Sequence, residues 1–545
     1  MSNFPFCFIW HGVNVYSSLS FDSFADDLGG QFPQPTRIQE PHDLYADSVL
    51  SSLHVFRVNT EHVQDASEDA SDSLRLPVTN FNHMIMKENI PMSWKKGQII
   101  PIHKKGNKTS KENYRPVTLL VTINKVFERC ISFQLNRLFD PLFSPLLSAY
   151  RQRYNCEAVL LRLVEDFRSA LDKRLVAGIV GLDLSKAFDI VPHNLLLAKL
   201  SAYGLDASSI NLLNNYLSGR YQRVALSDNV SEWKQVFNGV PQGSVLGPVL
   251  FNIFINDLFY FIQNCKISNF ADDNQIYKTG PAASDVNDAL NAEIITADLW
   301  FKNNLLSVNQ SKRESMFISK SDSTYLDLKM DQIEIPPVPK LQLLGVVIDS
   351  KLKFSDQVAN VCRKVSKQLA VLGRFKNILP THIKLLILLI YKTYVLPHFI
   401  YCSSVWHFCS EMDCSKLEKL NHRFLKFIFK DNSDYEVLTM RAGTTTLQVR
   451  RIQDICIIVF KILNGLAPSY LNSLVTLRNN MKNLRGHKKL VVPKAKSTTY
   501  GLNSFNYFSA KIWNSLPDRL RTITTLNIFK TEISKDVCII LSVCT

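Results

Sequence analysis

The chain has 545 residues, which leaves room for about three or four domains at roughly 150 residues each. It is 46% hydrophobic and 20% charged, the balance of an ordinary globular protein and not of a disordered one. Its 63 Lys and Arg residues outnumber 48 Asp and Glu residues, giving a net charge of +15. Such an excess favours a polyanionic partner, nucleic acid first and an anionic membrane surface second.

The cellular setting is indicated by what the sequence lacks. Its densest apolar run, residues 385–391, is far shorter than the 18 or more residues of a membrane span, so we expect a core helix there and no membrane anchor. The N-terminus has no basic region or small-residue cleavage site, so no signal peptide is predicted. Eleven scattered cysteines indicate a reducing compartment. No paired zinc pattern matches the spacing of the most suggestive group, which comprises Cys402, Cys409, Cys414, His398 and His407.

The first elements alternate between basic, helical and strand-like stretches. Residues 1 to about 75 are poorly patterned and read as a linker or remnant, whereas residues 95–115 are rich in lysine and indicate a basic hairpin or a solvated face. Two amphipathic helices are predicted at 119–138 and 155–173. A short apolar strand then ends at Asp183. This alternation favours an α/β or α+β sheet with helices against one face.

Later segments complete that pattern. The stretch 243–262 reads as a glycine-marked turn leading into a buried helix, and beyond about residue 350 the pattern is mainly helical. A basic stretch at 478–496 is equally consistent with phosphate binding and with a solvated loop. No internal repeat is visible.

The most informative stretch is "ISNFADDNQIYK", residues 267–278, which predicts a hairpin with Asp272 and Asp273 at its tip. Two like charges about 4 Å apart cost roughly 4 kcal/mol at an effective dielectric near 20. The pair is therefore either a solvated turn or part of a metal site. Because Asp183 also ends a strand, the three carboxylates could converge on Mg²⁺, which prefers oxygen ligands.

The order of motifs strengthens the second alternative. "GLDLSKAFDIV", "NGVPQGSVLGPVLFNIFINDL" and "FADDNQIY" together resemble the palm motifs of reverse transcriptases, and are most similar to those of non-LTR (LINE-type) retrotransposons. "WKKGQIIPIHKKGNKTSKENYRPVTLL" resembles the finger motifs of that family. "WFKNNLLSVNQSKRESMFIS", "LQLLGVVIDSKLKFSDQV", "LPHFIYCSSVWHFC" and "YFSAKIWNSLP" resemble its later segments. The resemblance covers roughly residues 80 to 530.

This resemblance implies a role for each matching residue. Asp183, Asp272 and Asp273 would bind two Mg²⁺ ions, with Mn²⁺ as an alternative, and Lys312 would donate a proton to departing pyrophosphate. The nucleotide would be bound by Lys104 and Arg115 at its triphosphate, by Phe188 as a block to a ribose 2′-OH, and by Gln242 and Gly243. Without the motifs, Phe188 would read as a core aromatic and Pro-Gln-Gly-Ser as a turn.

Some residues call for a different reading. Asp189 is assigned to structure before catalysis, because its spacing puts it beyond the strand end. Asn274 stands where the family often has Thr, a mild change outside the metal shell. The family's endonuclease domain does not fit into the first 80 residues and no Cys-His knuckle is seen near the C-terminus, so we expect a truncated or partial element.

The resemblance therefore implies an α+β right-hand polymerase. We expect an N-terminal extension at 1–80, fingers and palm at 81–345, a helical thumb-like region at 346–440 and a basic C-terminal region at 441–545. The implied activity is RNA-directed DNA synthesis, with an RNA template, a DNA primer and target DNA, and dNTPs as partners. An endonuclease in trans is left open, no membrane is involved, and the nucleus is the expected location. The alternatives are a silent nucleic-acid-binding relic and another reverse transcriptase on the same palm, of the intron-maturase or repair type.

Overall fold

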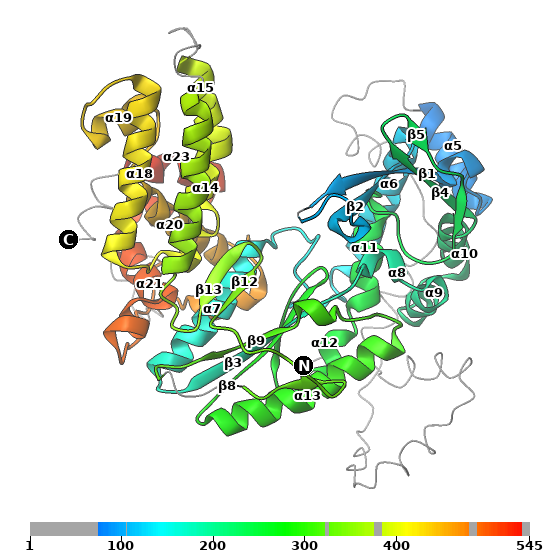
Figure 1. Ribbon diagram of the computed structural model, residues 1–545, viewed down its shortest axis with the longest axis horizontal. Coiled ribbons are helices and arrows are strands. Elements are labelled where there is room, and N and C mark those ends of the chain that lie inside the picture. Colours follow the sequence, from blue (N-terminus) through cyan, green and yellow to red (C-terminus); the bar gives the residue numbers. More distant parts are fainter. Residues whose placement is uncertain (1–74, 105, 322–325, 375–383, 479–487, 537–545) are drawn as a thin grey trace. The chain divides into compact units, whose positions relative to one another are not determined.

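The computed structural model describes residues 75–104, 106–321, 326–374, 384–478 and 488–536 (Figure 1). The chain divides into two compact units. The first comprises residues up to Ser144, Leu184–Leu258 and Leu299–Ser307; the second comprises Pro145–Asp183, Phe259–Asp298 and residues from Val308 onward. Helices and sheets occur together in the chain, so the predicted α+β class is confirmed. The poorly patterned N-terminal stretch and part of the basic stretch 478–496 lie outside the described residues.

The first unit contains a mixed sheet with the order β2-β1-β4-β5, in which β6 also pairs with β4. The strands are β1 (Lys96–His103), β2 (Tyr114–Leu119), β4 (Arg220–Leu226), β5 (Asn229–Val230) and β6 (Lys234–Val236). β1 and β2 form the predicted basic hairpin, with Ile102 opposite Arg115. β1 pairs with β4 in parallel, which joins the hairpin to a segment more than a hundred residues later.

Helices pack around this sheet and bury a core of their own. They are α5 (Arg75–Met86), α6 (Thr122–Phe139), α8 (Ala187–Ile190), α9 (His193–Ala202), α10 (Ala207–Leu217) and α11 (Leu246–Ile255). The predicted stripe of α6 is buried at Phe127, Ile131 and Leu135. α11 follows the predicted turn and is apolar nearly all round, as expected of a helix enclosed by neighbours.

The second unit is centred on an antiparallel sheet of order β7-β8-β3-β9. Its strands are β3 (Val176–Asp183), β7 (Lys266–Phe270), β8 (Asp273–Gly280) and β9 (Glu314–Ile318), and two long helices, α7 (Cys156–Asp172) and α13 (Ala283–Asn303), pack against it. The predicted strand ending at Asp183 and the predicted hairpin are both confirmed.

Helices cover both faces of this sheet, so the expectation of helices against one face is wrong. Successive residues of a strand point to opposite faces of the sheet. On one face Tyr277 of β8 contacts Phe167 of α7, with ring centroids 5.5 Å apart. On the other, a Cβ on Gly178 of β3 would lie 2.7 Å from Val286 of α13. A glycine at 178 therefore permits the close approach of α13.

Beyond the sheet, two small hairpins lead into a mainly helical region, as predicted. The strands are β10 (Lys329–Met330), β11 (Ile333–Glu334), β12 (Lys340–Leu343) and β13 (Val346–Asp349). The helices are α14 (Ser355–Arg374), α15 (Lys384–Ile390), α16 (Leu396–Ile400), α17 (Ser403–Trp406), α18 (Glu411–Phe429), α19 (Tyr435–Arg441), α20 (Leu447–Leu463), α21 (Phe505–Ser515), α22 (Asp518–Arg521) and α23 (Leu526–Lys535).

The prediction that residues 385–391 form a core helix is only half right. They are helical, but Leu385 is 77% exposed and Leu389 is 56% exposed, whereas Tyr391 is fully buried. The helix α15 contacts its neighbours on one side only, and its uniformly apolar sequence does not indicate which side that is. In the described parts of the chain, no helix combines the length and the hydropathy needed to cross a membrane.

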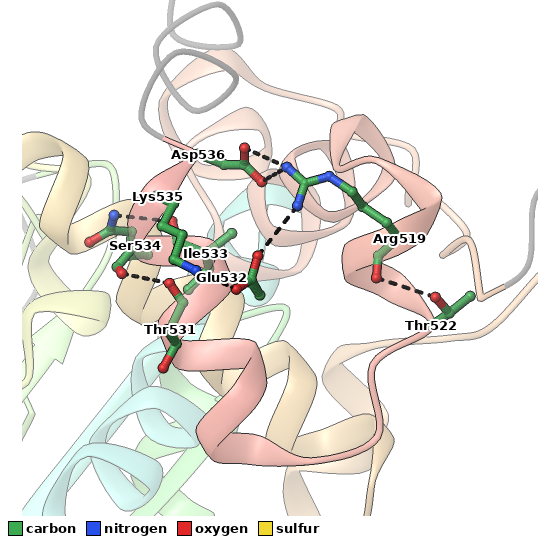
Figure 2. A network of polar contacts seen from close by, with 9 residues as sticks. Arg519, Thr522, Thr531, Glu532, Ile533, Ser534, Lys535 and Asp536 are labelled. Atoms are coloured by element: carbon green, nitrogen blue, oxygen red, sulfur yellow. Dashed lines mark hydrogen bonds and ion pairs between the residues drawn. The ribbon is translucent and has the colours of Figure 1, made fainter.

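The last helix, α23, is tied to α22 by an ionic network (Figure 2). The Arg519 guanidinium donates to both oxygens of Asp536, at 2.6 and 2.5 Å, and lies 3.6 Å from the Glu532 carboxylate. Lys535 pairs with the same Glu532 at 2.7 Å. Both bonds to Asp536 come from the same guanidinium nitrogen, Nη2, whereas Nη1 faces Glu532, so one arginine ties two carboxylates of the α23 segment to α22.

Candidate active site

The predicted site residues fall into two sets, one in each unit. Asp183, Asp272, Asp273 and Lys312 belong to the second unit. Lys104, Arg115, Phe188, Gln242 and Gly243 belong to the first.

The acidic set lies at one end of the antiparallel sheet of the second unit. Asp183, the last residue of β3, stands directly opposite Asp273, the first residue of β8. Asp273 also pairs with Phe270, the last residue of β7, so Ala271 and Asp272 form the tight turn between the two strands. Ala271 has a φ of 56°, the left-handed conformation that such a turn requires. The pairing of β3 with β8 thus brings together carboxylates that are ninety residues apart in sequence.

Two buried asparagines hold the turn in place. The Asn269 side-chain amide donates to the Ala271 carbonyl oxygen at 2.8 Å and to the Asn274 side chain at 2.9 Å. Asn274 in turn donates to the Asp272 carbonyl oxygen at 3.2 Å. Asn274 is 1% exposed, so the residue that the sequence marked only as a mild departure from the family pattern fixes the backbone that carries Asp272. No sequence signal singled out Asn269.

The charges at this sheet end oppose one another. Burial raises the pKa of Asp273 to about 7, and the Asp272 charge and a hydrogen bond with the Asp183 carboxyl act in the same direction. The Lys312 ammonium group partly compensates, since it donates to Asp183 Oδ2 at 2.5 Å. Lys312 ends a short 3₁₀ helix, Gln310–Lys312, whose capping residue Asn309 donates its backbone N–H to the Asp183 carbonyl oxygen at 2.8 Å. Asp183 and Lys312 are therefore coupled through both backbone and side chain.

The acidic set suits a divalent cation chemically. Its donors are carboxylate oxygens, the ligands that Mg²⁺ prefers. The pKa of Asp273 is raised first by burial and then by the neighbouring Asp272 and Asp183 carboxylates, whose charge a cation would neutralise. Within the described ranges, however, no group of three or more His, Cys, Asp or Glu side chains is gathered as a metal-binding cluster. The structure thus brings Asp183 and Asp273 into contact without gathering all three aspartates into such a cluster.

In the first unit, the two predicted phosphate-binding cations lie on the β1–β2 hairpin. Lys104 directly follows β1, and its backbone N–H donates to the Asn113 carbonyl oxygen at 2.8 Å. Arg115 lies on β2. Both residues are exposed. The hairpin therefore presents two cationic side chains to solvent from a hydrogen-bonded frame.

The Pro-Gln-Gly turn packs tightly against β2. The Thr118 backbone N–H donates to the Gln242 carbonyl oxygen at 2.7 Å. Gly243 has a φ of 114°, and a Cβ there would lie 2.7 Å from the Thr118 carbonyl oxygen. Only glycine fits both constraints. Phe188 is half-buried and stacks on Phe251 of α11, with ring centroids 4.5 Å apart. It is therefore in part the core aromatic residue that would be expected without the motifs.

A buried acid on α6 supports the same turn. Its only signal in the sequence is an acidic residue within an apolar stripe. Glu128 is fully buried, and its Oε2 accepts from the backbone N–H of Val245, just after the turn, at 2.6 Å. Its Oε1 accepts from Tyr216 at 2.8 Å and from Asn124 at 2.7 Å. Burial raises the pKa of Glu128. The carboxyl group thus caps the start of α11 and holds the segment that follows Gln242 in place.

The cysteines and histidines near residue 400 do not assemble into a metal centre among the described residues. The Sγ atoms of Cys409 and Cys414 lie 3.5 Å apart, and Arg451 donates to Cys414 at the same distance. His407 is half-buried beside Arg451 and Arg168, and the burial of its ring, followed by these charges, lowers its pKa to about 3. These groups form a polar cluster around Arg451.

Comparisons with known proteins agree with this geometry. Residues 102–348 match the family model described as "Reverse transcriptase (RNA-dependent DNA polymerase)". The chain is 27% identical over 359 residues to the probable RNA-directed DNA polymerase from transposon X-element of Drosophila melanogaster, covering 64% of this chain and 39% of that protein. It is 26% identical over 368 residues to the RNA-directed DNA polymerase from mobile element jockey of the same species, with the same two coverages.

Among solved structures, an apo telomerase from Candida tropicalis aligns with a TM-score of 0.34 at 15% identity, covering 50% of this chain and 57% of that one. This superposition is too loose to argue from. The chain spans 39% of the length of the two curated relatives named above.

The paired carboxylates at the ends of β3 and β8, within the stretch that matches the family model, define a reverse transcriptase domain. The two curated relatives named above are RNA-directed DNA polymerases of a transposon and of a mobile element. Residues 102–348 of the chain are thus similar in sequence to reverse transcriptases.

Proposed function

We propose that the chain is an RNA-directed DNA polymerase that extends a DNA primer along an RNA template. The observation that carries this proposal is the register of β3 and β8, which sets Asp183 opposite Asp273 beside the Asp272 turn in a domain of this family. In the reaction the primer 3′-oxygen forms a bond to the α-phosphorus of a dNTP, the bond to the β-phosphate breaks, and pyrophosphate leaves.

The predicted site residues would each have a distinct role. Asp183, Asp272 and Asp273 would hold two Mg²⁺ ions, with Mn²⁺ as a substitute. When bound, these ions neutralise the charge that develops on the attacking and departing oxygens. Lys104 and Arg115 would bind the triphosphate, and Lys312 would supply a proton to the departing pyrophosphate. The exposure of both hairpin cations and the contact of Lys312 with Asp183 support these roles.

The first unit would select the nucleotide. Phe188 would block a ribose 2′-OH, and Gln242 and Gly243 would line the pocket. Support comes from the tight packing of the Pro-Gln-Gly turn on Thr118, which presents these groups from a rigid frame. We further propose fingers and palm within 81–345, a thumb at 346–440 and a basic C-terminal region at 441–545, all contacting nucleic acid.

The biological setting follows from this activity. RNA template, DNA primer, target DNA and dNTPs would be the partners, an endonuclease would act in trans, and the nucleus would be the site of action. The net charge of +15 supports a nucleic-acid partner. A catalytically silent relic that still binds nucleic acid is the alternative, and the following experiment separates the two.

Primer extension on poly(rA)–oligo(dT) with Mg²⁺ and dTTP tests the proposal. The wild-type chain should extend the primer, and Asp272→Asn should not, although both should bind the template equally because the electrostatic grip comes from Lys and Arg. Replacement of the exposed Asp228, in the β4–β5 turn, with Asn serves as a control that should retain synthesis. A folded wild-type protein that binds the template but extends nothing would support the relic. Extension by Asp272→Asn would refute the metal assignment.

A further inference from the structure

Asp189 follows Phe188 in α8, and its carboxylate contacts a residue predicted to bind nucleotide. The Gln242 side-chain amide donates from Nε2 to Asp189 Oδ1 at 3.1 Å and to Oδ2 at 3.2 Å. Both residues lie in the first unit and are half-buried. The acid that the sequence assigned to structure is therefore in direct contact with the Pro-Gln-Gly turn.

This contact determines the orientation of the Gln242 side-chain amide. A carboxylate has no hydrogen to donate, so the amide group must turn its nitrogen toward Asp189. The carbonyl oxygen Oε1 is then the end of the amide that is left to accept from another group. Without Asp189, the amide would be free to turn through half a rotation and present a donor there instead.

The backbones of the two segments are also joined, so the contact is built into the fold. The Val240 N–H donates to the Phe188 carbonyl oxygen at 2.7 Å, and the Gly239 N–H donates to the Val191 carbonyl oxygen at 2.8 Å. A Cβ at Gly239 would lie 2.4 Å from the Asp189 carbonyl oxygen. Together with the Thr118 bond to Gln242, these contacts hold the Asp189 carboxylate and the Gln242 amide at a set separation.

The electrostatic surroundings connect Asp189 to the other predicted nucleotide-binding group of this unit. Burial raises the pKa of Asp189, whereas the hydrogen bond from Gln242 and the charges of Lys186 and Lys104 lower it. Lys104 is therefore close enough to act on this carboxylate, and Asp189 interacts with both Gln242 and a predicted triphosphate-binding lysine.

We propose that Asp189 is a positioning residue for the incoming nucleotide, which holds the Gln242 amide so that its carbonyl oxygen accepts a hydrogen bond from the bound dNTP. Asp189 itself does not touch the nucleotide. The inference rests on the proposed polymerase function and deepens it, since it assigns the orientation of the nucleotide pocket to a residue outside the metal-binding set.

The test is a double-mutant cycle on the steady-state constants for dTTP in primer extension. Asp189→Ala should raise KM for dTTP roughly tenfold, the value of one hydrogen bond to a charged group, with a smaller fall in kcat. Gln242→Ala should have a similar effect, and the double variant should be no worse than Gln242→Ala alone. Asp189→Asn should recover part of the loss, because its side-chain oxygen still accepts. Asp228→Ala is the matched control and should leave KM unchanged.

Each outcome either supports or overturns the positioning role of Asp189. An unchanged KM in Asp189→Ala, or additive losses in the double variant, would overturn the inference while leaving the polymerase function standing. If Asp189→Ala does not fold, as judged by its melting temperature, Asp189→Leu takes its place. A KM for dTTP that is higher in Asp189→Leu than in Asp189→Asn would then support the inference, and equal KM values in these two variants would overturn it. A wild-type protein that extends no primer would refute the proposed function and with it the positioning role.

Discussion

Asp183 and Asp273 lie directly opposite each other in the register of β3 and β8, and their carboxyl groups share a hydrogen bond. Two carboxyl groups can form such a bond only when one of them carries a proton. Burial raises the pKa of Asp273 to about 7, and the Asp272 charge and the hydrogen bond with Asp183 act in the same direction, so this sheet end takes up a proton more readily than an exposed aspartate would. A bound cation would displace the proton, so protonation and metal binding compete at this sheet end.

This competition predicts a pH-dependent stability. The folded-state pKa of Asp273 is raised from 3.8 to about 7, so the folded chain binds a proton more tightly than the unfolded chain, and the free energy of unfolding should fall as the pH rises across that interval. Asp273→Asn mimics the protonated form at every pH. In EDTA, the melting temperature of this variant should exceed that of the wild type by a few degrees at pH 8 and by much less at pH 5.

Addition of Mg²⁺ provides the second half of that measurement. At pH 8 Mg²⁺ should raise the melting temperature of the wild type and have a smaller effect on Asp273→Asn, because a ligand that binds only the folded state stabilises it. Parallel melting curves for the two proteins across pH, with no selective effect of Mg²⁺, would contradict the account of this sheet end.

Breaking a buried ion pair in the first unit should lower the free energy of unfolding substantially. The Lys199 ammonium donates to Asp257 Oδ1 and to the Phe254 carbonyl oxygen, both at 2.8 Å, and the two charged side chains are 4% and 6% exposed. Lys199→Met would leave an unpaired buried carboxylate and should cost about 3–5 kcal/mol in urea unfolding. Lys199→Met combined with Asp257→Leu should cost clearly less. Equal losses in the single and double variants would show that the pair is not the source of the effect.

The glycine in the Pro-Gln-Gly turn offers a test of packing with a matched control. Gly243 and Gly219 both have positive φ angles, 114° and 64°, but only at Gly243 would a Cβ meet a neighbour, the Thr118 carbonyl oxygen. Gly219→Ala should therefore cost only the backbone strain, about 1–2 kcal/mol. Gly243→Ala should cost more and should also raise KM for dTTP, measured by unfolding and by primer extension. Similar KM values for the two variants would show that the turn is not part of the nucleotide pocket.

The thiol pair in the helical region predicts a selective chemical reactivity. The hydrogen bond from Cys409 lowers the pKa of Cys414 to about 7, with help from Arg451, whereas burial raises the pKa of Cys362. At pH 7, iodoacetamide should alkylate Cys414 faster than Cys362, as read by peptide mass spectrometry, because the thiolate is the nucleophile. Cys409→Ala should slow the reaction of Cys414 roughly five- to tenfold. An unchanged rate in that variant would contradict the proposed source of the lowered pKa.

The local pattern predicted most elements of this protein. Apolar spacing along the chain is enough to specify α6, α7, β3 and the β7–β8 hairpin, because each of these elements buries one face that its own periodicity defines. The uniform apolar run of α15 carried no such information, and its burial was predicted only in part. The order and identity of the motifs also indicated the reverse transcriptase family. Each motif consists of residues that are close together in sequence, so it can be recognised without the tertiary structure.

By itself, the sequence determined which residues can carry the chemistry: three aspartates, two hairpin cations and a Pro-Gln-Gly turn. Only the tertiary structure decided that Asp183 meets Asp273, that Asn269 and Asn274 fix the Asp272 turn, and that Asp189 holds the Gln242 amide. The reason is physical. These contacts join residues that are distant in sequence or depend on which way a single side chain points, and both depend on strand register and packing, which no local pattern encodes.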